Sequence, residues 1–351
     1  MYLLLAGLAV ILIFSYFYYK YKRKSVACLM YHNVFPEKTE GIISEKEFEK
    51  HMEYIKDMKT YKMEELEKMN YILDEKSILV TFDDGYKNNY TKAFSILKKY
   101  NIKATIFLNT VYIENDKDYL NWNEIREMYE SGLVDFQLHT HSHYPTIRKA
   151  EIKGFFEKTE GDFVKREYFS IFREGLSKKE KAEIKDFRDF DFTRLPVFKI
   201  RSQISIKGMK LKEGFMDKYR EIVNSEEFKG KSSKEQKIFL NKLFKEQKKE
   251  FFEEISDEEF EKRVEFEIRE NKRLIEEKLN KKAEFLSYPW GHAYKGNVEK
   301  IKKLGIKSFV MTSGNASGVK LNPERIYRIN GDRIKDYNLF EKKLKSVYNK
   351  G

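Results

Sequence analysis

The chain has one cysteine and few histidines, and it lacks any recognisable motif of nucleic-acid-binding proteins. The single Cys28 excludes an intramolecular disulfide and is compatible with either an oxidising or a reducing compartment. Of the six histidines in 351 residues, three stand between residues 139 and 143, and none follows His292. An isolated histidine is usually structural, so this uneven distribution makes the 139–143 segment the first candidate for chemistry.

Charge is absent from residues 2–19, YLLLAGLAVILIFSYFYY. This run is about long enough to cross a hydrocarbon core of roughly 30 Å as a helix, and no small-residue cleavage site precedes Lys20. We therefore expect residues 1–25 to form a single-pass transmembrane anchor with a basic flank, which places the protein at the cell membrane. The flank, residues 20–24, favours a cytoplasmic catalytic domain by the positive-inside rule.

Lysine and arginine outnumber aspartate and glutamate by 69 to 57, which gives a net charge of +12. The excess is spread along charged helices and is not gathered in a basic arm, so we expect no nucleic-acid partner. A cationic surface suits anionic lipid headgroups or an acidic glycan. A solvated lysine-rich surface explains the same composition.

Residues 77–86, SILVTFDDGY, have the pattern of a buried strand that ends in a tight turn. Asp83 and Asp84 are adjacent, so an extended backbone points them to opposite sides. One carboxylate can then bind a cation while the other meets a different partner. A structural Asp-Gly turn before a helix from about Asn88 explains the same residues.

A second apolar run, residues 134–138, leads into His139, His141 and His143. In a strand all three imidazoles would share one face, and if the chain turns after Leu138 the 139/143 pair can still converge on one ion. Two imidazoles and one carboxylate from another strand end make a metal site with open positions for water. Asp84 is the expected third ligand.

These segments resemble the motifs of the polysaccharide deacetylases of the NodB-homology type, carbohydrate esterase family 4. TFDDGY, residues 81–86, is similar to the first motif of that family, and the resemblance implies that Asp83 is the general base and Asp84 a metal ligand. HTHSH, residues 139–143, is similar to the second motif, which implies that the outer pair of histidines binds the metal and that His141 is a spacer.

A third similarity is YPWG, residues 288–291, which matches the groove-lining Pro-aromatic-Gly segment of the family. The substrate-binding positions expected from these motifs are Tyr86, Tyr288, Pro289 and Trp290. Many members carry an arginine two residues before the proline, where this chain has Ser287, so the base must be oriented from elsewhere. Arg328 and Asp332 lie where such an orienter could sit, although we expect them to serve in a strand-end salt bridge.

The segment LMYHNV, residues 29–34, resembles the Met-Tyr-His strand of the poly-N-acetylglucosamine deacetylase-like branch of the family. On that resemblance His32 is the proton donor, in place of a C-terminal Leu-x-His that this chain lacks. His292 is the competing candidate, while His51 lies on an expected helix with an apolar face. This branch works outside the cytoplasmic membrane, whereas the basic flank favours a catalytic domain in the cytoplasm.

Strands and helices alternate in most of the chain, which predicts a parallel sheet, and catalytic groups at consecutive strand ends indicate the C-terminal rim of an α/β barrel. We expect an α/β fold, a distorted (β/α) barrel of the NodB-homology type with a large, mostly helical insertion. Residues 26–146 and 256–351 form the two parts of the barrel, and residues 147–255 form the charged insertion.

Within the insertion, helices are expected near residues 146–160, 177–190 and 233–254, and residues 194–208 are expected to be extended. The insertion is either a lid that recognises substrate or a helical ornament that packs on the barrel or on a second copy of the chain. Its aromatic residues are expected to form its own small core and not a platform for sugars. They include Phe155, Phe156, Phe163, Tyr168 and Phe169.

The predicted function is metal-dependent removal of N-acetyl or N-formyl groups from amino sugars of a cell-envelope polysaccharide or a lipid-linked glycan. A divalent ion held by Asp84, His139 and His143 would activate water and polarise the amide. Zinc is the expected ion, and cobalt, nickel or iron also suit these ligands.

Two alternatives remain at this stage. The His-rich segment also looks like the HxH motif of PHP-type phosphoesterases and like the HxHxDH motif of the metallo-β-lactamase fold. In both of these classes His141 would be a metal ligand. An inactive deacetylase-like domain would instead act as a membrane-tethered glycan-binding protein.

Overall fold

The computed structural model describes residues 7, 10–16, 25–37, 41–74, 76–157, 161–312, 317–334 and 336–348. Most of the expected membrane span, residues 2–19, and all of its basic flank lie outside these ranges. Among the described residues, none of the helices combines the length and the apolar character that a membrane crossing requires.

The chain divides into two compact units. The first unit contains residues 1–142, 267–291 and 299–351, and the second contains residues 143–266 and 292–298. Helix α12 (Asp257–Leu279) begins in the second unit and ends in the first. The second unit is thus wider than the insertion expected from the sequence, and it includes His143 and His292.

The first unit is built on a curled sheet whose central strands are parallel, as expected for a barrel of this type. The strand order is β13 (Ser308–Val310), β12 (Phe285–Ser287), β7 (Val134–Leu138), β6 (Ala104–Leu108), β5 (Ile78–Phe82), β1 (Ser25–Tyr31) and β14 (Ser317–Gly318), of which β14 is antiparallel to β1. Strand β4 (Thr60–Tyr61) pairs with β5, and β15 (Ile329–Asn330) pairs with β1. Every residue of β5, β6 and β7 is buried, which is typical of parallel strands covered on both faces.

One short segment joins the two edges of this sheet. The backbone of Ile326 bonds to Phe309 and Met311 at β13, and three residues later Ile329 pairs in parallel with Leu29 of β1. The chain between these positions therefore closes the curled sheet. Arg328 lies within this closing segment, which decides its role in the site.

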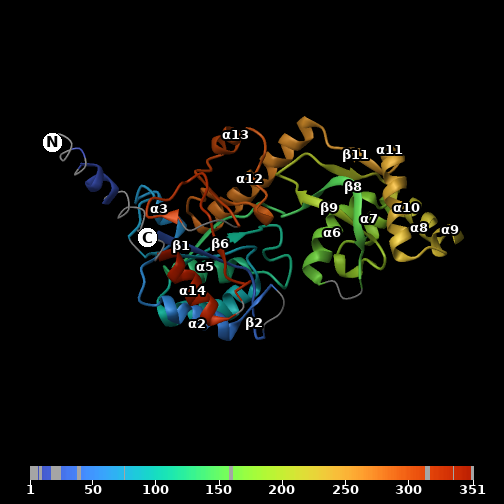
Figure 1. Ribbon diagram of the computed structural model, residues 1–351. Coiled ribbons are helices and arrows are strands. Elements are labelled where there is room, and N and C mark those ends of the chain that lie inside the picture. Colours follow the sequence, from blue (N-terminus) through green and yellow to red (C-terminus); the bar gives the residue numbers. More distant parts are fainter. Residues whose placement is uncertain are drawn as a thin grey trace. The chain divides into compact units, whose positions relative to one another are not determined.

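Helices pack around the sheet of the first unit (Figure 1). They are α2 (Glu45–Ile55), α3 (Met63–Leu66), α4 (Phe94–Tyr100), α5 (Trp122–Glu130), α13 (Val298–Lys303) and α14 (Tyr337–Tyr348), with a π-helical turn at Asn89–Ala93 and a short β2 (Val34–Phe35) and β3 (Ile43–Ser44) pair. The Ser44 hydroxyl accepts from the Glu47 amide and begins α2, as the capping-box pattern predicts. The start of α2 is therefore determined by residues that are close to it in the chain.

The second unit, green to orange in Figure 1, contains an antiparallel sheet in addition to the helices that we expected for the insertion. Its antiparallel sheet has the order β11 (Phe252–Glu254), β10 (Met209–Leu211), β8 (Pro145–Phe155) and β9 (Pro196–Ser202). Its helices are α6 (Asp162–Gly175), α7 (Lys178–Glu183), α8 (Phe215–Asn224), α9 (Glu226–Lys229), α10 (Ser233–Glu246) and α11 (Lys248–Phe251).

The expected helix at residues 146–160 is wrong, because most of that segment is strand β8. Its apolar residues follow neither a clean helical nor a clean strand period, since β8 pairs with β9 through several register shifts. Pairing with a partner about fifty residues away therefore decided the conformation. The extended conformation expected for residues 194–208 is confirmed by β9.

Phenylalanines dominate the core of the second unit. Phe156, Tyr168 and Phe169 belong to this core, and Phe155 packs against it, as expected. Phe163 does not belong to it and is 38% exposed.

Candidate active site

Titratable side chains follow the C-terminal ends of four parallel strands of the first unit, of which β5, β1 and β15 are adjacent and β7 is separated from β5 by β6. His32 follows β1, Asp83 and Asp84 follow β5, His139 follows β7, and Asp332 follows β15. In a barrel of parallel strands these ends meet at one rim, which is where catalytic groups of such folds gather. The structure thus brings together groups that are up to 300 residues apart in the sequence.

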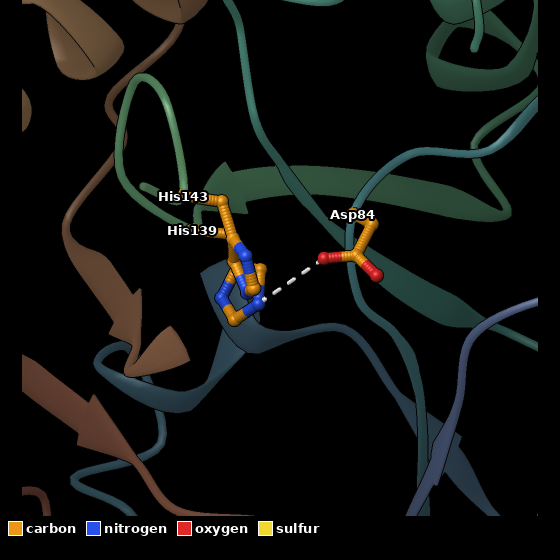
Figure 2. Close-up of side chains that lie close together, drawn as sticks. All are labelled: Asp84, His139 and His143. Atoms are coloured by element: carbon orange, nitrogen blue, oxygen red, sulfur yellow. Dashed lines mark ion pairs between the residues drawn. The ribbon is translucent and has the colours of Figure 1, made fainter. Parts of the chain in front are cut away.

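Asp84, His139 and His143 form a cluster that could hold a metal ion (Figure 2). One ligand atom from each residue lies within 4.8 Å of the other two. Asp84 Oδ1 is 3.4 Å from His139 Nε2, and all three residues are buried. His141 is not part of the cluster; its Nδ1 lies 3.0 Å from the Thr110 hydroxyl.

A hydrogen bond on the far side of the ring orients His139. Its Nδ1 lies 2.8 Å from the carbonyl oxygen of Ser287, and a carbonyl only accepts, so Nδ1 carries the proton. The lone pair of the imidazole is then on Nε2, the atom that faces Asp84. Metal-binding histidines are commonly held in this way by an acceptor on the second nitrogen. The donor set, one carboxylate and two imidazoles, fits a divalent ion such as zinc.

The backbone at the cluster adopts an unusual conformation. Asp84, Thr140, His143 and Trp290 all have positive φ angles, of 76°, 69°, 59° and 53°. Such angles cost a non-glycine residue on the order of 1 kcal/mol or more, and they concentrate at functional sites. Both ligand loops therefore turn sharply, which lets neighbouring residues point in different directions, as Asp83 and Asp84 do.

Asp83 is paired with Arg328 in the interior of the first unit. The guanidinium donates to both carboxylate oxygens at 2.7 Å, and both side chains are about 1% exposed. Burial alone would raise the pKa of Asp83, but the charge of Arg328 outweighs it and holds the pKa below its ordinary value. Asp83 therefore stays ionised.

The remaining N–H groups of Arg328 are also occupied. Nε donates to the Met311 carbonyl, and the terminal nitrogens donate in addition to the hydroxyls of Thr81 and Ser287. All five guanidinium donors thus have acceptors. Arg328 supplies the orienting arginine that is missing before Pro289, while Ser287 is the residue that occupies the space next to it. The sequence suggested Arg328 as a possible orienter, although we expected a strand-end salt bridge; the ion pair that it forms is with Asp83 itself.

His32 forms the second buried pair of the rim. Its Nδ1 is 2.6 Å from Asp332 Oδ2, and its side chain is 33% exposed while that of Asp332 is 1% exposed. Burial lowers the pKa of His32, but the hydrogen bond and charge of Asp332, with smaller contributions from Asp84 and Asp83, raise it to about 9. A partly exposed, protonated imidazole next to two carboxylates is suited to donate a proton.

The other two histidines have different surroundings. His51 is fully buried, lies 3.0 Å from the Tyr31 hydroxyl and stacks on Phe340 with ring centroids 3.7 Å apart, so it belongs to the core. His292 lies in the second unit, where its Nδ1 accepts from the Ser202 amide. Burial and then nearby arginines lower the pKa of His292 to about 4, so it is neutral at pH 7 and poorly suited to donate a proton.

Residues 70–167 match the family model described as Polysaccharide deacetylase. The chain contains a polysaccharide deacetylase domain. The matched range holds Asp83, Asp84, His139 and His143, so the two motifs of the metal cluster both lie within it. It does not hold His32, Arg328 or Asp332, which complete the rim of the deacetylase domain.

Two relatives of known name are similar to parts of this chain. YxkH of Bacillus subtilis (strain 168), whose name describes a polysaccharide deacetylase, is 34% identical over 128 residues, which are 35% of this chain and 44% of YxkH. The poly-beta-1,6-N-acetyl-D-glucosamine N-deacetylase of Staphylococcus aureus (strain MRSA252) is 28% identical over 192 residues, 48% of this chain and 63% of that protein. The similarity thus covers less than two thirds of either relative.

Solved structures of deacetylases share the fold. A de-N-acetylase from Aggregatibacter actinomycetemcomitans has a TM-score of 0.58 at 14% identity, with 90% of this chain and 98% of that chain covered. IcaB from Ammonifex degensii has a TM-score of 0.53 at 16% identity, with 93% and 97% covered. These identities are low, so the likeness concerns the fold alone.

The aromatic positions of the deacetylase motifs lie mostly in the interior. Tyr86 is 5% exposed and packs on Tyr119, and Tyr288 is 3% exposed and stacks on Phe309. Their burial gives no support to the expected contact with substrate, because core packing already uses both rings; Pro289 is also buried. Trp290 is half-buried, and its contact with substrate stays a prediction.

Helix α12 holds the loop that carries His139, which the sequence did not reveal. The side-chain carbonyl of Asn271 accepts from the His139 amide, and its amide group donates to Leu108 and Thr110. Glu267 accepts from both the amide and the hydroxyl of Ser142. Buried polar residues on an otherwise amphipathic helix were the available signal, but their partners lie more than 120 residues away.

Proposed function

We propose that this chain is a metal-dependent hydrolase that removes N-acetyl, or N-formyl, groups from amino sugars of a cell-envelope polysaccharide or a lipid-linked glycan. The observation that carries the proposal is the arrangement at the barrel rim. This rim combines a metal-capable triad, an ionised carboxylate held by an arginine, and a protonated imidazole held by a carboxylate. Amide hydrolysis needs these three functions.

Asp84, His139 and His143 would hold a divalent ion, most suitably zinc, with cobalt, nickel and iron as alternatives. When bound, such an ion lowers the pKa of a coordinated water and polarises the carbonyl of the N-acyl group. The expected oxyanion donor, a backbone amide near Trp290, remains a prediction.

Asp83 accepts the proton of the attacking water in this proposal. Its carboxylate is ionised because Arg328 lowers its pKa, and the two-pronged contact fixes the plane of the carboxylate. The lowered pKa makes Asp83 a weak base, so proton transfer relies on a water that is already acidified. Arg328 thus makes Asp83 a weaker base, but it keeps the Asp83 carboxylate ionised and correctly oriented.

His32 donates a proton to the departing amine. Its pKa of about 9 keeps it protonated at neutral pH, and Asp332 fixes the ring through Nδ1, which leaves Nε2 to carry the transferred proton. The side chain is partly exposed, so a substrate can reach it. The products of the reaction are the free amino sugar and acetate.

The alternatives have less support. A phosphoesterase of the HxH type would need His141 as a ligand, whereas its Nδ1 lies beside Thr110 and the ring stands outside the metal-capable cluster. An inactive, glycan-binding domain was suggested by the absence of an arginine before Pro289, and Arg328 fills that position in space. The substrate is a proposal that draws on the names of the relatives, one of which acts on poly-beta-1,6-N-acetyl-D-glucosamine.

The test is acetate release by the full-length chain, purified in detergent and loaded with zinc, from β-1,6-linked N-acetylglucosamine oligomers and from other N-acetylated envelope glycans. Asp83→Asn is the matched control, because it keeps the volume of the side chain and removes the base. A zinc-loaded parent that releases no acetate, yet cleaves a model phosphodiester, would overturn the proposal in favour of the phosphoesterase.

We also propose, from the sequence alone, that residues 2–19 anchor the protein in the cell membrane. The basic flank favours a cytoplasmic deacetylase domain, which would act on lipid-linked precursors and not on finished polymer. A reporter enzyme that is active only outside the cytoplasm, fused after Gly351, tests this orientation. Strong reporter activity rules it out.

A further inference from the structure

Helix α6 of the second unit lies against the metal ligand His143. Glu167 Oε1 is 3.1 Å from His143 Nδ1, and the ring of Phe163 has its centroid 6.3 Å from that of His143. All three residues belong to the second unit. Phe163 and Glu167 are four residues apart, so they share one face of the helix.

Glu167 is a buried carboxylate whose charge is compensated by a neighbouring imidazole. It is 6% exposed, and a carboxylate that is removed from water is costly unless a charged or hydrogen-bonding group compensates it. The imidazole of His143 is such a group on the side of Nδ1. A carboxylate on one nitrogen of a histidine fixes the ring and makes the other nitrogen a better metal ligand.

Phe163 is the exception among the aromatic residues of this helix. Tyr168 and Phe172 lie on another face of α6 and are buried in the core of the second unit. Phe163 lies outside that core and is 38% exposed. Aromatic faces next to a catalytic centre offer large, rigid contact area to an apolar or amphipathic ligand.

We propose that α6 serves the metal ligand beside it: Glu167 is a positioning residue for His143, and Phe163 contacts a sugar ring of the glycan that is bound next to His143. The inference rests on the proposed function for the nature of the ligand. It goes beyond the motifs of the family, because both residues act from the segment that the sequence presented as an insertion.

The test of Glu167 measures metal affinity and needs no turnover. Full-length apo protein is titrated with zinc against a chromophoric chelator, for the parent, Glu167→Gln and the control Glu174→Gln, which removes an exposed acid of the same helix. We expect Glu167→Gln to bind zinc about 10- to 100-fold more weakly and Glu174→Gln to bind like the parent. Affinity of Glu167→Gln within twofold of the parent overturns the role.

A second variant separates positioning from misfolding. In a His143→Ala background the zinc affinity is already reduced, and Glu167→Gln should cause no further loss if it acts only through His143. A further loss of the same factor would show that Glu167 acts on the fold and not on the ligand, and would also overturn the role.

The test of Phe163 measures glycan binding by zinc-loaded protein. Isothermal titration with a β-1,6-linked N-acetylglucosamine pentamer is compared for the parent, Phe163→Ala, Phe163→Tyr and the control Ile238→Ala, which removes an exposed apolar side chain of the same unit. We expect Phe163→Ala to raise Kd and KM about 3- to 10-fold with kcat and zinc affinity unchanged, and Phe163→Tyr to bind like the parent.

The outcomes distinguish this inference from the proposed function. If the parent binds the pentamer but releases no acetate, the proposed function fails while the binding comparison still decides the role of Phe163. If Phe163→Ala binds as well as the parent, or if the parent binds no pentamer, the sugar contact is overturned.

Discussion

Replacing Arg328 by methionine should destabilise the first unit strongly. The change keeps an unbranched side chain of similar length but removes all five donors and leaves Asp83 as a buried charge with no counter-ion of its own. Removing one partner of a buried ion pair typically costs about 3–5 kcal/mol. A domain is stabilised by only about 5–15 kcal/mol in total, so the loss should be easy to measure.

Tryptophan fluorescence is the appropriate assay. The two tryptophans of the chain, Trp122 and Trp290, both lie in the first unit, so their emission during urea unfolding reports the unit that contains Arg328. This matters because a chain with two compact units need not unfold in one step.

The double variant Arg328→Met with Asp83→Asn provides the control. Neutralising the carboxylate removes the uncompensated charge, so the double variant should regain most of the lost stability, whereas independent residues would give additive losses. A cost of less than about 1 kcal/mol for Arg328→Met, or no recovery in the double variant, would refute the pairing as the structure presents it.

The pH dependence of the free energy of unfolding gives an independent test of the Arg328–Asp83 pair. In the parent the pKa of Asp83 is lowered on folding, so its contribution to stability is present above the ordinary pKa of an aspartate and is lost as the pH falls. In Arg328→Met the largest of the charges that oppose the effect of burial is removed, so the pKa of Asp83 rises relative to the parent. The deficit of the variant should therefore shrink as the pH is lowered and Asp83 takes up a proton.

Three further predictions concern the rim. His139→Ala should lose the bound metal while His141→Ala keeps it, as measured by the metal content of the purified protein; equal losses would favour the phosphoesterase. His32→Ala should keep its metal and lose about 10²- to 10⁴-fold in amide hydrolysis, but much less with an activated ester, whereas His292→Ala should stay within a few-fold of the parent. Because the pKa of His32 is about 9, kcat/KM should fall as the pH rises through that value, and Asp332→Asn should move this limb to lower pH; an unmoved limb would exclude His32 as the titrating acid.

The resemblance of short motifs was sufficient to find the three residues that could hold a metal ion. Asp84, His139 and His143 are supplied by two short segments, each following a buried strand, and the spacing within each segment is a local property of the chain. Which of Asp83 and Asp84 faces the cluster was also implied by that resemblance. The roles of these residues in catalysis remain to be measured.

The sequence determined by itself those features that depend on neighbours along the chain. These are the alternation of strands and helices, the capping of α2 by Ser44, the apolar stripe of α12 and the turns that carry the ligands. Only the tertiary structure decided which distant groups meet: Arg328 with Asp83, Asp332 with His32, and the conformation of β8 through its pairing with β9. The physical reason is that a buried charge, or a strand with an ambiguous pattern, is stabilised by a partner that the folded sheet brings within about 3 Å. Such a partner is far away in the sequence, so no local periodicity of the sequence indicates it.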